Sequence, residues 1–370
     1  MNPRLRVMFL APALDGGGAE RVFSTLLRHL DRSCFELHLA VLQAKGDYIK
    51  EIPADVTIHD LQVARARYGL LSIVRVIRDV RPKIVVSTLA NMNLTLMSVK
   101  PFLPAGTKLL IRESSIASSS LKRERHPAVW EWLYPRLYRR ADSIICLSDS
   151  MVKNMVECFG LPASKLVRIY NPVDTERVRG AAACENPYSE AGPRLVAVGR
   201  LGWEKGFDIL IAAMPAILAR FPSAYLTILG RGPLAADLAQ QATSLGLGDR
   251  VRFAGFQQNP WTYIKYADVL VHPSRYEGCP NVLLEALALG TPVVATDCPG
   301  ATREIQNDYR NMIVAAADDR DALANAMLSV CEGHAARVEP AVNEQNRFDV
   351  RQIVEEYARL FLHVAQVAAP

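Results

Sequence analysis

The sequence predicts an α/β protein in which two doubly wound, Rossmann-like domains follow one another along the chain. Its 370 residues exceed what a single hydrophobic core usually holds. Short β-rich runs alternate with amphipathic stretches of helical period, which is typical of parallel sheets covered by helices on both faces. The alternation fades over residues 175–193, which are polar and contain Pro and Gly, and then restarts.

We expect a first domain over residues 1–174, a linker over 175–193, a second domain over 194–348 and a final helix within 349–370 that could pack on either domain. Ligands of doubly wound sheets bind at the carboxyl ends of the strands, so we expect the site in a cleft between the domains. The expected strands are Leu5–Leu10, Leu37–Leu42, Val56–Leu61, Lys83–Thr88, Lys108–Ile111, Ser143–Leu147, Leu166–Tyr170, Leu195–Val198, Tyr225–Leu229, Val251–Phe253, Val269–Val271, Pro292–Ala295 and Ile313–Val314. The expected helices after the linker are Phe207–Arg220, Leu234–Leu245, Val282–Leu289, Ala322–Cys331 and about Val350–Val364.

The basic residues are concentrated in the first half of the chain. Residues 1–174 hold 25 Lys and Arg against 16 Asp and Glu, a net charge of +9, whereas residues 175–370 carry −4. A basic half indicates anionic partners such as phosphates, an anionic lipid surface or a nucleic acid. Because the spacings typical of nucleic-acid motifs are missing from the sequence, we expect no nucleic-acid partner.

The sequence predicts neither a membrane span nor a disulfide framework. No apolar run reaches the ~18 residues that a spanning helix needs. The apolar start, residues 1–14, runs into three glycines without a convincing cleavage site, so we interpret it as a first strand. Seven scattered cysteines without C-x-x-C spacing indicate reduced thiols and argue against a zinc site. We expect a cytoplasmic protein.

A glycine-rich turn stands between the first expected strand and the first expected helix. Glycines let a ligand approach the backbone closely, and a helix amino terminus offers free N–H groups to an anion. The spacing is not that of the dinucleotide fingerprint G-x-G-x-x-G. The candidate residues are Gly16, Gly17 and Gly18. They could bind a phosphate or substrate, or they could simply form a tight turn.

A second glycine-rich segment, residues 199–206, follows the first strand of the second domain and opens a helix. It carries Arg200 and Lys205, two cations five positions apart. A leaving nucleoside diphosphate gains negative charge in the transition state, so fixed cations at this place would lower the barrier. The alternative is a solvated loop with a salt bridge from Arg200 to Glu204.

Two glutamates, Glu277 and Glu285, flank the start of a later helix with seven residues between them. Glu277 lies in a loop after a strand, where it could accept hydrogen bonds from sugar hydroxyls and favour positive charge at the anomeric carbon. Glu285 lies one turn into the helix among apolar residues, where a carboxylate needs donors such as ribose hydroxyls. The N–H groups near Asn281 and Val282 could hold phosphate. Stabilisation by the helix dipole is the alternative, and it explains only one of the two glutamates.

These segments together resemble the GT-B glycosyltransferases of family 4, and the resemblance covers nearly the whole chain. Supporting segments are Asn171-Pro172-Val173-Asp174, Gly230-Arg231-Gly232-Pro233 and Val251-Arg252-Phe253-Ala254-Gly255. The resemblance implies that Arg200 and Lys205 bind the donor diphosphate. It likewise implies that Glu285 binds the ribose and that Glu277 binds the donor sugar.

The same resemblance places Val251 and Phe253 near the base, and Gly16–Gly18 near the phosphates and the acceptor. It implies retention of anomeric configuration, a UDP-sugar donor, no essential metal and no cofactor, since the nucleotide sugar is a substrate. It also implies that the final helix crosses back to the first domain.

The sequence departs from the family pattern at one place. Many members have a histidine after a first-domain strand, where this chain has Arg112 and Glu113. We therefore take both as candidates beside the reacting sugar, with Glu113 as a catalytic residue, and a surface ion pair as the alternative. Ser87 and Asn91 stand at the end of another strand and could face an acceptor or be ordinary loop residues. Members with this pattern often extend glycans on lipid carriers, which implies a glycan or lipid-linked saccharide acceptor.

The segment Lys122–Arg140 combines six basic residues with two tryptophans and two tyrosines, against two glutamates. Such a mixture suits peripheral contact with an anionic membrane face. The alternative is packing on the core, because Trp130, Leu133 and Leu137 share a helical spacing. Pro135 is expected to interrupt a long helix.

Two weaker features have ordinary interpretations. Asp319-Arg320-Asp321 matches the D-x-D of metal-dependent glycosyltransferases, but it opens a predicted helix, so capping is expected there rather than a metal site. His272 lies among apolar residues and is expected to be structural. The rival functions are another GT-B-shaped enzyme, such as an epimerase or phosphorylase, a catalytically silent sugar-nucleotide-binding subunit, and an NAD-dependent dehydrogenase, which the missing fingerprint disfavours.

Overall fold

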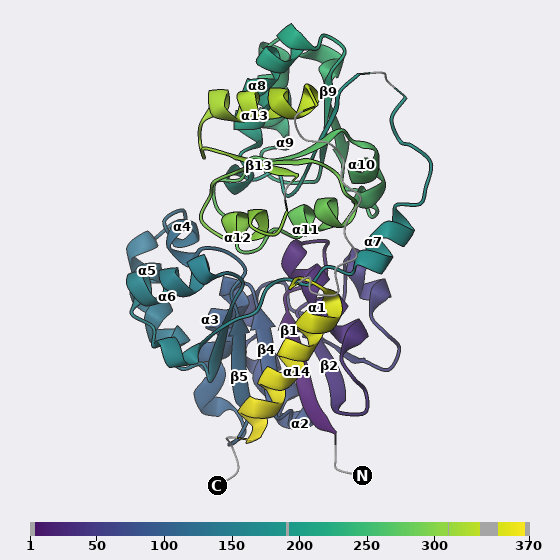
Figure 1. Ribbon diagram of the computed structural model, residues 1–370. Helices are drawn as coiled ribbons and strands as arrows, with labels where there is room; N and C mark the ends of the chain where they lie inside the picture. The colour runs from purple at the N-terminus through teal and green to yellow at the C-terminus, as the bar shows by residue number, and fades with distance from the viewer. Residues whose placement is uncertain (1–3, 190–191, 310, 334–346, 367–370) are drawn as a thin grey trace. The chain divides into compact units, whose positions relative to one another are not determined.

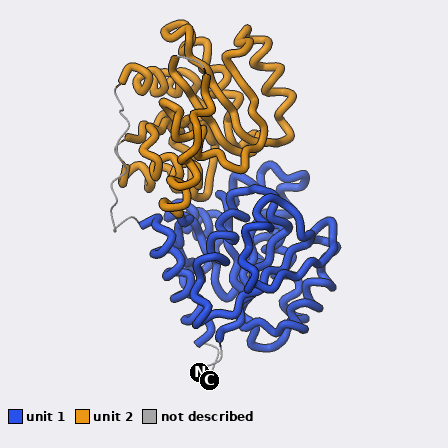
Figure 2. The backbone as a smooth tube through the Cα atoms, turned by 90° about the vertical axis from the view of Figure 1, so that its right-hand side faces the viewer, with its two compact units in different colours: residues 1–172, 347–370 blue, residues 173–346 orange. Residues whose placement is uncertain are grey.

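A computed structural model of the chain shows two compact units (Figure 2). Unit 1 comprises residues 1–172 and 347–370, and unit 2 comprises residues 173–346. Each unit is a parallel sheet covered by helices, so the predicted fold class is confirmed. The residues that the structure describes are 4–189, 192–309, 311–333 and 347–366.

Unit 1 is built on a seven-stranded parallel sheet with the order β3-β2-β1-β4-β5-β6-β7. The chain steps outward from β1 to β3, then returns past β1 and steps outward on the other side from β4 to β7. This reversal makes the sheet doubly wound. Its strands are β1 (Leu5–Ala11), β2 (Phe35–Val41), β3 (Thr57–Asp60), β4 (Ile84–Thr88), β5 (Lys108–Arg112), β6 (Ser143–Cys146) and β7 (Leu166–Arg168).

The helices of unit 1 lie on both faces of this sheet. Right-handed crossovers put α1 and α2 on opposite faces, because the chain steps one way from β1 to β2 and the other way from β3 to β4. The final helix, α14, packs against α1 (Figure 1), and its Phe361 contacts Phe9 and Phe35 edge to face, with ring centroids 6.2 and 6.1 Å apart. The helices are α1 (Gly18–His29), α2 (Leu70–Val80), α3 (Ala90–Val99), α4 (Ala117–Leu121), α5 (Pro127–Tyr138), α6 (Asp149–Phe159) and α14 (Val350–Gln366), with short 3₁₀ turns η1 (Asp47–Glu51), η2 (Ala66–Tyr68), η3 (Lys100–Phe102) and η4 (Ala163–Lys165).

Unit 2 repeats the plan with a six-stranded parallel sheet of order β10-β9-β8-β11-β12-β13. Helices α8 and α13 pack together, and Leu210, Met214 and Met327 are fully buried in the core that they share. The strands are β8 (Arg194–Val198), β9 (Tyr225–Leu229), β10 (Val251–Gly255), β11 (Val269–His272), β12 (Val293–Thr296) and β13 (Met312–Ala315). The helices are α7 (Thr175–Ala181), α8 (Phe207–Arg220), α9 (Ala235–Ser244), α10 (Pro260–Tyr266), α11 (Asn281–Ala288), α12 (Thr302–Gln306) and α13 (Arg320–Cys331), with 3₁₀ turns η5 (Trp203–Lys205) and η6 (Gly248–Arg250).

Every strand predicted from the sequence overlaps an observed strand, and α8 has the predicted bounds. Two local expectations are wrong. Part of the expected linker is helix α7, which begins because the Asp174 side chain accepts a hydrogen bond from Arg177 N. Pro135 lies inside α5 without ending it, since the buried rings of Tyr134 and Tyr138 on either side hold this last part of the helix on the core. Across the described ranges, none of the helices combines the length and apolar character needed to cross a bilayer.

Candidate active site

The carboxyl edge of the unit 2 sheet brings together the segments that follow β8 and β11. Lys205 Nζ lies 2.5 Å from Glu277 Oε1, although 72 positions separate the two residues. Glu277 is buried and Lys205 is half-buried. The sequence singled out both residues, and the structure joins them in one ion pair.

Lys205 and Ser274 donate to Oε1 of the Glu277 carboxylate, and the His272 ring lies beside it. Besides Lys205, Ser274 Oγ donates over 2.7 Å and His272 Nε2 lies 3.0 Å away. Burial by itself would raise the pKa of Glu277, but Lys205 and His272 outweigh it and hold that pKa well below its usual range. Burial lowers the pKa of His272. Lys205 is therefore the main group that keeps Glu277 ionised, and the buried His272 ring lies beside the pair.

Close backbone contacts fix the position of this carboxylate. Gly206 has φ +64°, and a Cβ added there would lie 2.0 Å from Pro273 O. Gly300 has φ +135°, and its added Cβ would lie 2.7 Å from Glu277 O. Glu277 N donates to Pro299 O over 2.9 Å. The loops after β8, β11 and β12 thus touch backbone to backbone, which only glycine permits at these two positions.

Arg275 is a structural residue that the sequence did not single out. Its guanidinium donates to both carboxylate oxygens of Asp208, over 2.8 and 2.7 Å, and to Asp318 Oδ1 over 2.7 Å. It also stacks 4.5 Å from the ring centroid of Trp203, while Arg275 N donates to Glu204 O. Arg275 therefore fastens the turn that carries Lys205 to the loop that carries Glu277. One arginine within a run of loop residues gives no sequence signal for this role.

Arg200 lies apart from the buried ion pair. Its side chain is 66% exposed and donates twice to Glu204 Oε1, over 3.0 and 2.8 Å. This is the salt bridge that the sequence left open as an alternative. The two cations of the predicted pair therefore differ, since Lys205 is fixed against Glu277 and Arg200 is held at the surface.

The remaining candidates of unit 2 lie on α11 and β10. Glu285 is buried within α11, and the Pro280 cap leaves the first turn, which begins at Asn281 and Val282, without a side-chain cap. Phe253 is half-buried on β10, whereas the side chain of Val251 belongs to the unit 2 core. A base near β10 would therefore meet Phe253 or the backbone rather than the Val251 side chain.

The glycine turn of unit 1 already has an anionic partner. Gly17 N donates to Glu20 Oε2 over 2.7 Å, so the carboxylate of the first helical turn caps α1. Burial raises the pKa of Glu20. A phosphate at Gly16, Gly17 or Gly18 would have to compete with this side chain.

Arg112 and Glu113 are both buried, so the surface ion pair considered for them is wrong. Arg112 donates to Thr88 Oγ1 over 3.1 Å and to Asn171 Oδ1. Glu113 Oε2 accepts from the hydroxyls of Tyr134, 2.5 Å away, and of Tyr138, 2.6 Å away. Burial raises the pKa of Glu113, against the opposing effect of these hydroxyls. The geometry does not support direct action of Glu113 on a sugar, because two stacked tyrosines seal it.

The polar residues at the end of β4 and just after it also differ in their surroundings. Ser87 is fully buried and donates to Asn93 Oδ1 over 2.6 Å, so it does not face an acceptor as predicted. Asn93 in turn donates to the Tyr138 hydroxyl over 3.2 Å and joins the network around Glu113. Asn91 is exposed and remains a candidate for contact with an acceptor.

The D-x-D segment caps a helix, as expected. Asp319 Oδ1 accepts from Asp321 N over 3.0 Å and from Ala322 N over 2.9 Å. Within the part of the chain that the structure describes, His, Cys, Asp and Glu side chains form no group of three or more that could hold a metal ion.

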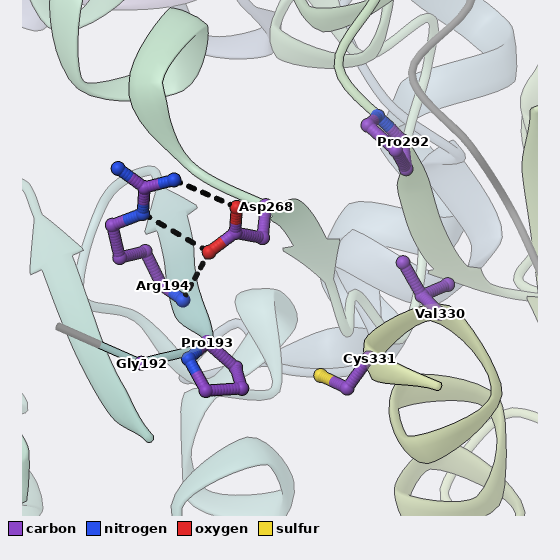
Figure 3. A pocket seen from close by; sticks show the side chains of 7 residues that line it. All are labelled: Gly192, Pro193, Arg194, Asp268, Pro292, Val330 and Cys331. Carbon is purple, nitrogen blue, oxygen red and sulfur yellow. Dashed lines mark hydrogen bonds and ion pairs between the residues drawn. The ribbon is translucent and has the colours of Figure 1, made fainter. Parts of the chain in front are cut away.

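A hollow in unit 2 lies at the opposite, amino-terminal edge of the sheet (Figure 3). Arg194 and Asp268 line it and pair with each other, with Arg194 Nη2 2.8 Å from Asp268 Oδ1. Ligands of doubly wound sheets bind at the carboxyl edge. The Lys205–Glu277 edge is therefore the better candidate for the site.

Comparison with known families agrees with this site. Residues 16–177 match the model described as Glycosyltransferase Family 4, and residues 192–332 match the model described as Glycosyl transferases group 1. The chain belongs to glycosyltransferase family 4. The two matched regions together span most of its length and include both the glycine turn and the Lys205–Glu277 pair.

This family 4 glycosyltransferase has curated relatives with named activities. It is 28% identical over 332 residues to the N-acetylgalactosamine-N,N'-diacetylbacillosaminyl-diphospho-undecaprenol 4-alpha-N-acetylgalactosaminyltransferase of Campylobacter jejuni, a match covering 86% of this chain and 88% of the relative. It is 33% identical over 258 residues to the glycogen synthase of Mycobacterium tuberculosis, and this match covers 68% of this chain and 60% of that protein.

Solved structures show the GT-B fold. Anabaena HepE in complex with UDP aligns with a TM-score of 0.73 at 21% identity, over 97% of this chain and 100% of that one. Sucrose-phosphate synthase of Thermosynechococcus elongatus aligns with a TM-score of 0.78 at 18% identity, over 98% of this chain and 100% of that one. At these identities the likeness establishes the fold, while the choice of donor and acceptor depends on the residues of the site.

Proposed function

We propose that this glycosyltransferase moves a sugar from a nucleoside diphosphate sugar to a saccharide acceptor with retention of anomeric configuration. The observation that carries the proposal is the ionised Glu277 held against Lys205 at the carboxyl edge of unit 2. A fixed cation beside a fixed carboxylate suits a reaction in which a diphosphate leaves with negative charge and the anomeric carbon becomes positive. The UDP in the HepE complex supports uridine diphosphate as the leaving group.

The diphosphate is bound by Lys205 and Arg200. Lys205 is held in place by Glu277, whereas Arg200 is exposed and exchanges its salt bridge with Glu204 for the phosphates when donor binds. The first turn of α11 adds backbone N–H groups at Asn281 and Val282. Neutralising the diphosphate at these points lowers the barrier to its departure.

Each of the two glutamates contacts a different part of the donor. Glu285, buried on α11, accepts hydrogen bonds from the ribose hydroxyls, which stabilise a carboxylate in that position. Within the described ranges the hydrogen-bond partners of the Glu277 carboxylate all lie on Oε1, which leaves Oε2 to accept from hydroxyls of the donor sugar. Because its pKa is low, Glu277 acts as an acceptor and as a negative charge, not as a proton donor.

The reaction proposed needs no metal ion. In metal-dependent transferases a divalent ion neutralises the departing diphosphate. Here Lys205 and Arg200 supply that positive charge from the protein. Activity should therefore persist in the presence of a chelator.

The acceptor proposed is a lipid-linked saccharide at the cytoplasmic face of a membrane. The Campylobacter jejuni relative is named for a diphospho-undecaprenol acceptor, and residues 1–174 carry a net charge of +9. In the basic stretch Lys122–Arg140, Val129 and Trp132 are exposed on α5, while Tyr134 and Tyr138 are buried behind them. Peripheral contact through this stretch would therefore use its tryptophan and arginines, and not its tyrosines.

The test is a transfer assay with UDP-sugars and lipid-linked acceptors in EDTA, with the product's anomeric configuration read by NMR. We expect a product with the configuration of the donor. Inversion would contradict retention, and complete loss of activity in EDTA with rescue by Mn²⁺ or Mg²⁺ would contradict metal independence. Cleavage of the saccharide by added inorganic phosphate, with release of a sugar phosphate, would instead favour a phosphorylase.

A further inference from the structure

Arg275 holds the backbone of the turn that ends in Lys205. Arg275 Nη1 donates to Trp203 O over 2.7 Å, and Arg275 N donates to Glu204 O over 2.8 Å. The loop after β11 thus occupies the two carbonyls that come just before Lys205. The guanidinium also stacks on the Trp203 ring. One residue therefore fixes the backbone from which the Lys205 side chain extends.

The same guanidinium fastens this turn to two further elements. Its Nη1 and Nη2 donate to Asp208, the second residue of α8, and its Nε donates to Asp318, which follows β13. Burial would raise the pKa of Asp208, but Arg275 outweighs it and lowers that pKa. The Arg275 side chain is only 9% exposed. It therefore joins the segments that follow β8, β11 and β13 from within the protein.

Arg275 is poorly suited to bind a phosphate itself. Four of its five guanidinium N–H groups already donate within unit 2. Because Arg275 faces both Asp208 and Asp318, the three side chains together have a formal net charge of −1. An anion gains little from such a cluster. Any effect of Arg275 on the reaction must therefore pass through the residues that it holds.

We propose that Arg275 is a positioning residue of the transfer reaction and sets the place of the Lys205 ammonium. This inference rests on the proposed function, in which Lys205 stabilises the departing diphosphate. Lys205 Nζ must keep its ion pair with Glu277 and also reach the phosphates, so a small displacement of its backbone weakens stabilisation of the transition state. A lysine at position 275 would keep the charge but could not form the bidentate pair with Asp208.

The test measures kcat and the donor KM of Arg275→Lys and Arg275→Met, with Arg194→Met as the matched control. Arg194 also forms a bidentate pair with an aspartate, Asp268, and also lies over an aromatic ring, but at the opposite edge of the same sheet (Figure 3). It therefore reports the cost of losing such a pair away from Lys205. Melting temperatures check folding, and Arg275→Lys keeps a cation between the two aspartates in case Arg275→Met does not fold.

Both Arg275 variants should lower kcat by about thirtyfold or more and leave the donor KM within about threefold of the parent, because misplacing Lys205 acts mainly on the transition state. Arg194→Met should keep kcat within about twofold, since it disturbs no group near the leaving diphosphate. Normal kcat in Arg275→Lys, or equal losses of kcat in the Arg275 variants and in Arg194→Met, would overturn the proposal.

A double variant shows whether Arg275 acts through Lys205. In Lys205→Ala the turn no longer carries an ammonium, so adding Arg275→Lys should lower kcat by no more than about threefold. Losses that multiply in the double variant would overturn the positioning role. The two accounts also fail in different ways. Normal turnover in Lys205→Ala contradicts the proposed function, whereas impaired Lys205→Ala with normal Arg275→Lys contradicts only this inference.

Discussion

Glu113 and Glu277 both follow a strand of a parallel sheet, β5 in unit 1 and β11 in unit 2, yet their surroundings differ in kind. Glu277 meets a lysine ammonium and lies beside the His272 imidazole, and its pKa is held low. Glu113 meets two tyrosine hydroxyls, and burial raises its pKa. The same topological position thus carries a charged acceptor in one unit and a sealed structural carboxyl in the other.

The difference teaches that the carboxyl edge of a sheet locates candidates but does not assign their roles. A carboxylate beside a half-buried cation is kept ionised and can respond to a ligand that binds the same cation. A carboxyl saturated by hydroxyl donors from α5 fastens that helix to β5. The predictions below test this contrast, beginning with the largest expected effect.

Replacing Glu277 with Gln should lower kcat by about a hundredfold or more, because it removes the charge facing the anomeric carbon and leaves Lys205 without its partner. Ser274→Ala is the matched control, since it removes one donor to the same oxygen and keeps the charge. Steady-state kinetics would measure kcat for both variants. If Glu277→Gln turned over as fast as Ser274→Ala, the assigned role of Glu277 would be wrong.

Replacing Glu113 with Gln should reduce stability by about 1–3 kcal/mol, since the amide adds a donor where the carboxylate only accepts. Denaturant unfolding measures this, and Tyr134→Phe, which removes one hydroxyl but keeps the ring, should cost less. The folded fraction should retain most of its kcat. A well-folded Glu113→Gln enzyme with a hundredfold lower kcat would restore a catalytic role for Glu113 and break the contrast.

The stability of the parent should also depend on pH through Glu113. Its pKa is raised in the folded state, so the folded protein binds this proton more tightly than the unfolded chain does. The resulting stabilisation is fully present below the unfolded pKa and is lost as pH rises through the folded value. Glu113→Gln should remove this contribution to the slope of the unfolding free energy against pH. If the difference in unfolding free energy between parent and variant stayed constant across that pH range, the contribution assigned to Glu113 would be wrong.

Replacing Glu285 with Ala should weaken UDP binding by roughly tenfold, because the ribose hydroxyls lose a charged acceptor. Titration calorimetry with UDP gives the affinity directly. Glu277→Ala should have less effect on UDP, which lacks the donor sugar. Unchanged UDP affinity in both variants would show that the ribose assignment is wrong.

The smallest effect concerns the basic stretch Lys122–Arg140 of unit 1. Reversing Lys122, Arg123 and Arg125 to Glu should weaken binding to anionic vesicles by roughly fivefold at low salt, through general attraction within the screening length. UDP affinity should not change, since these residues lie outside unit 2. Unchanged vesicle binding would argue against membrane contact through this stretch.

Much of the fold could be predicted from the sequence because buried strands of parallel sheets are continuous apolar runs, as in β4 and β11. The Lys205–Glu277 pair could be nominated, since both residues stand at helix starts after strands. Their contact could not be predicted, because the two residues are 72 positions apart and meet only where loops touch at Gly206 and Gly300.

The errors have a common physical origin. Ser87, Arg112 and Glu113 look accessible in sequence because they are polar and end strands. Asn93 supplies the hydrogen-bond partner of Ser87, Tyr134 and Tyr138 those of Glu113, and Thr88 and Asn171 those of Arg112. Polar networks of this kind are specified by tertiary packing and leave no local periodicity.

The central claim is that the fixed cation of unit 2, Lys205, stabilises the leaving diphosphate, and its most direct test is the kcat of Lys205→Ala. Loss of one such donor should lower kcat by about 10²–10³, with the melting temperature checked in parallel. The exposed Arg200→Ala should lower kcat less. Near-normal turnover in a folded Lys205→Ala enzyme would contradict the account.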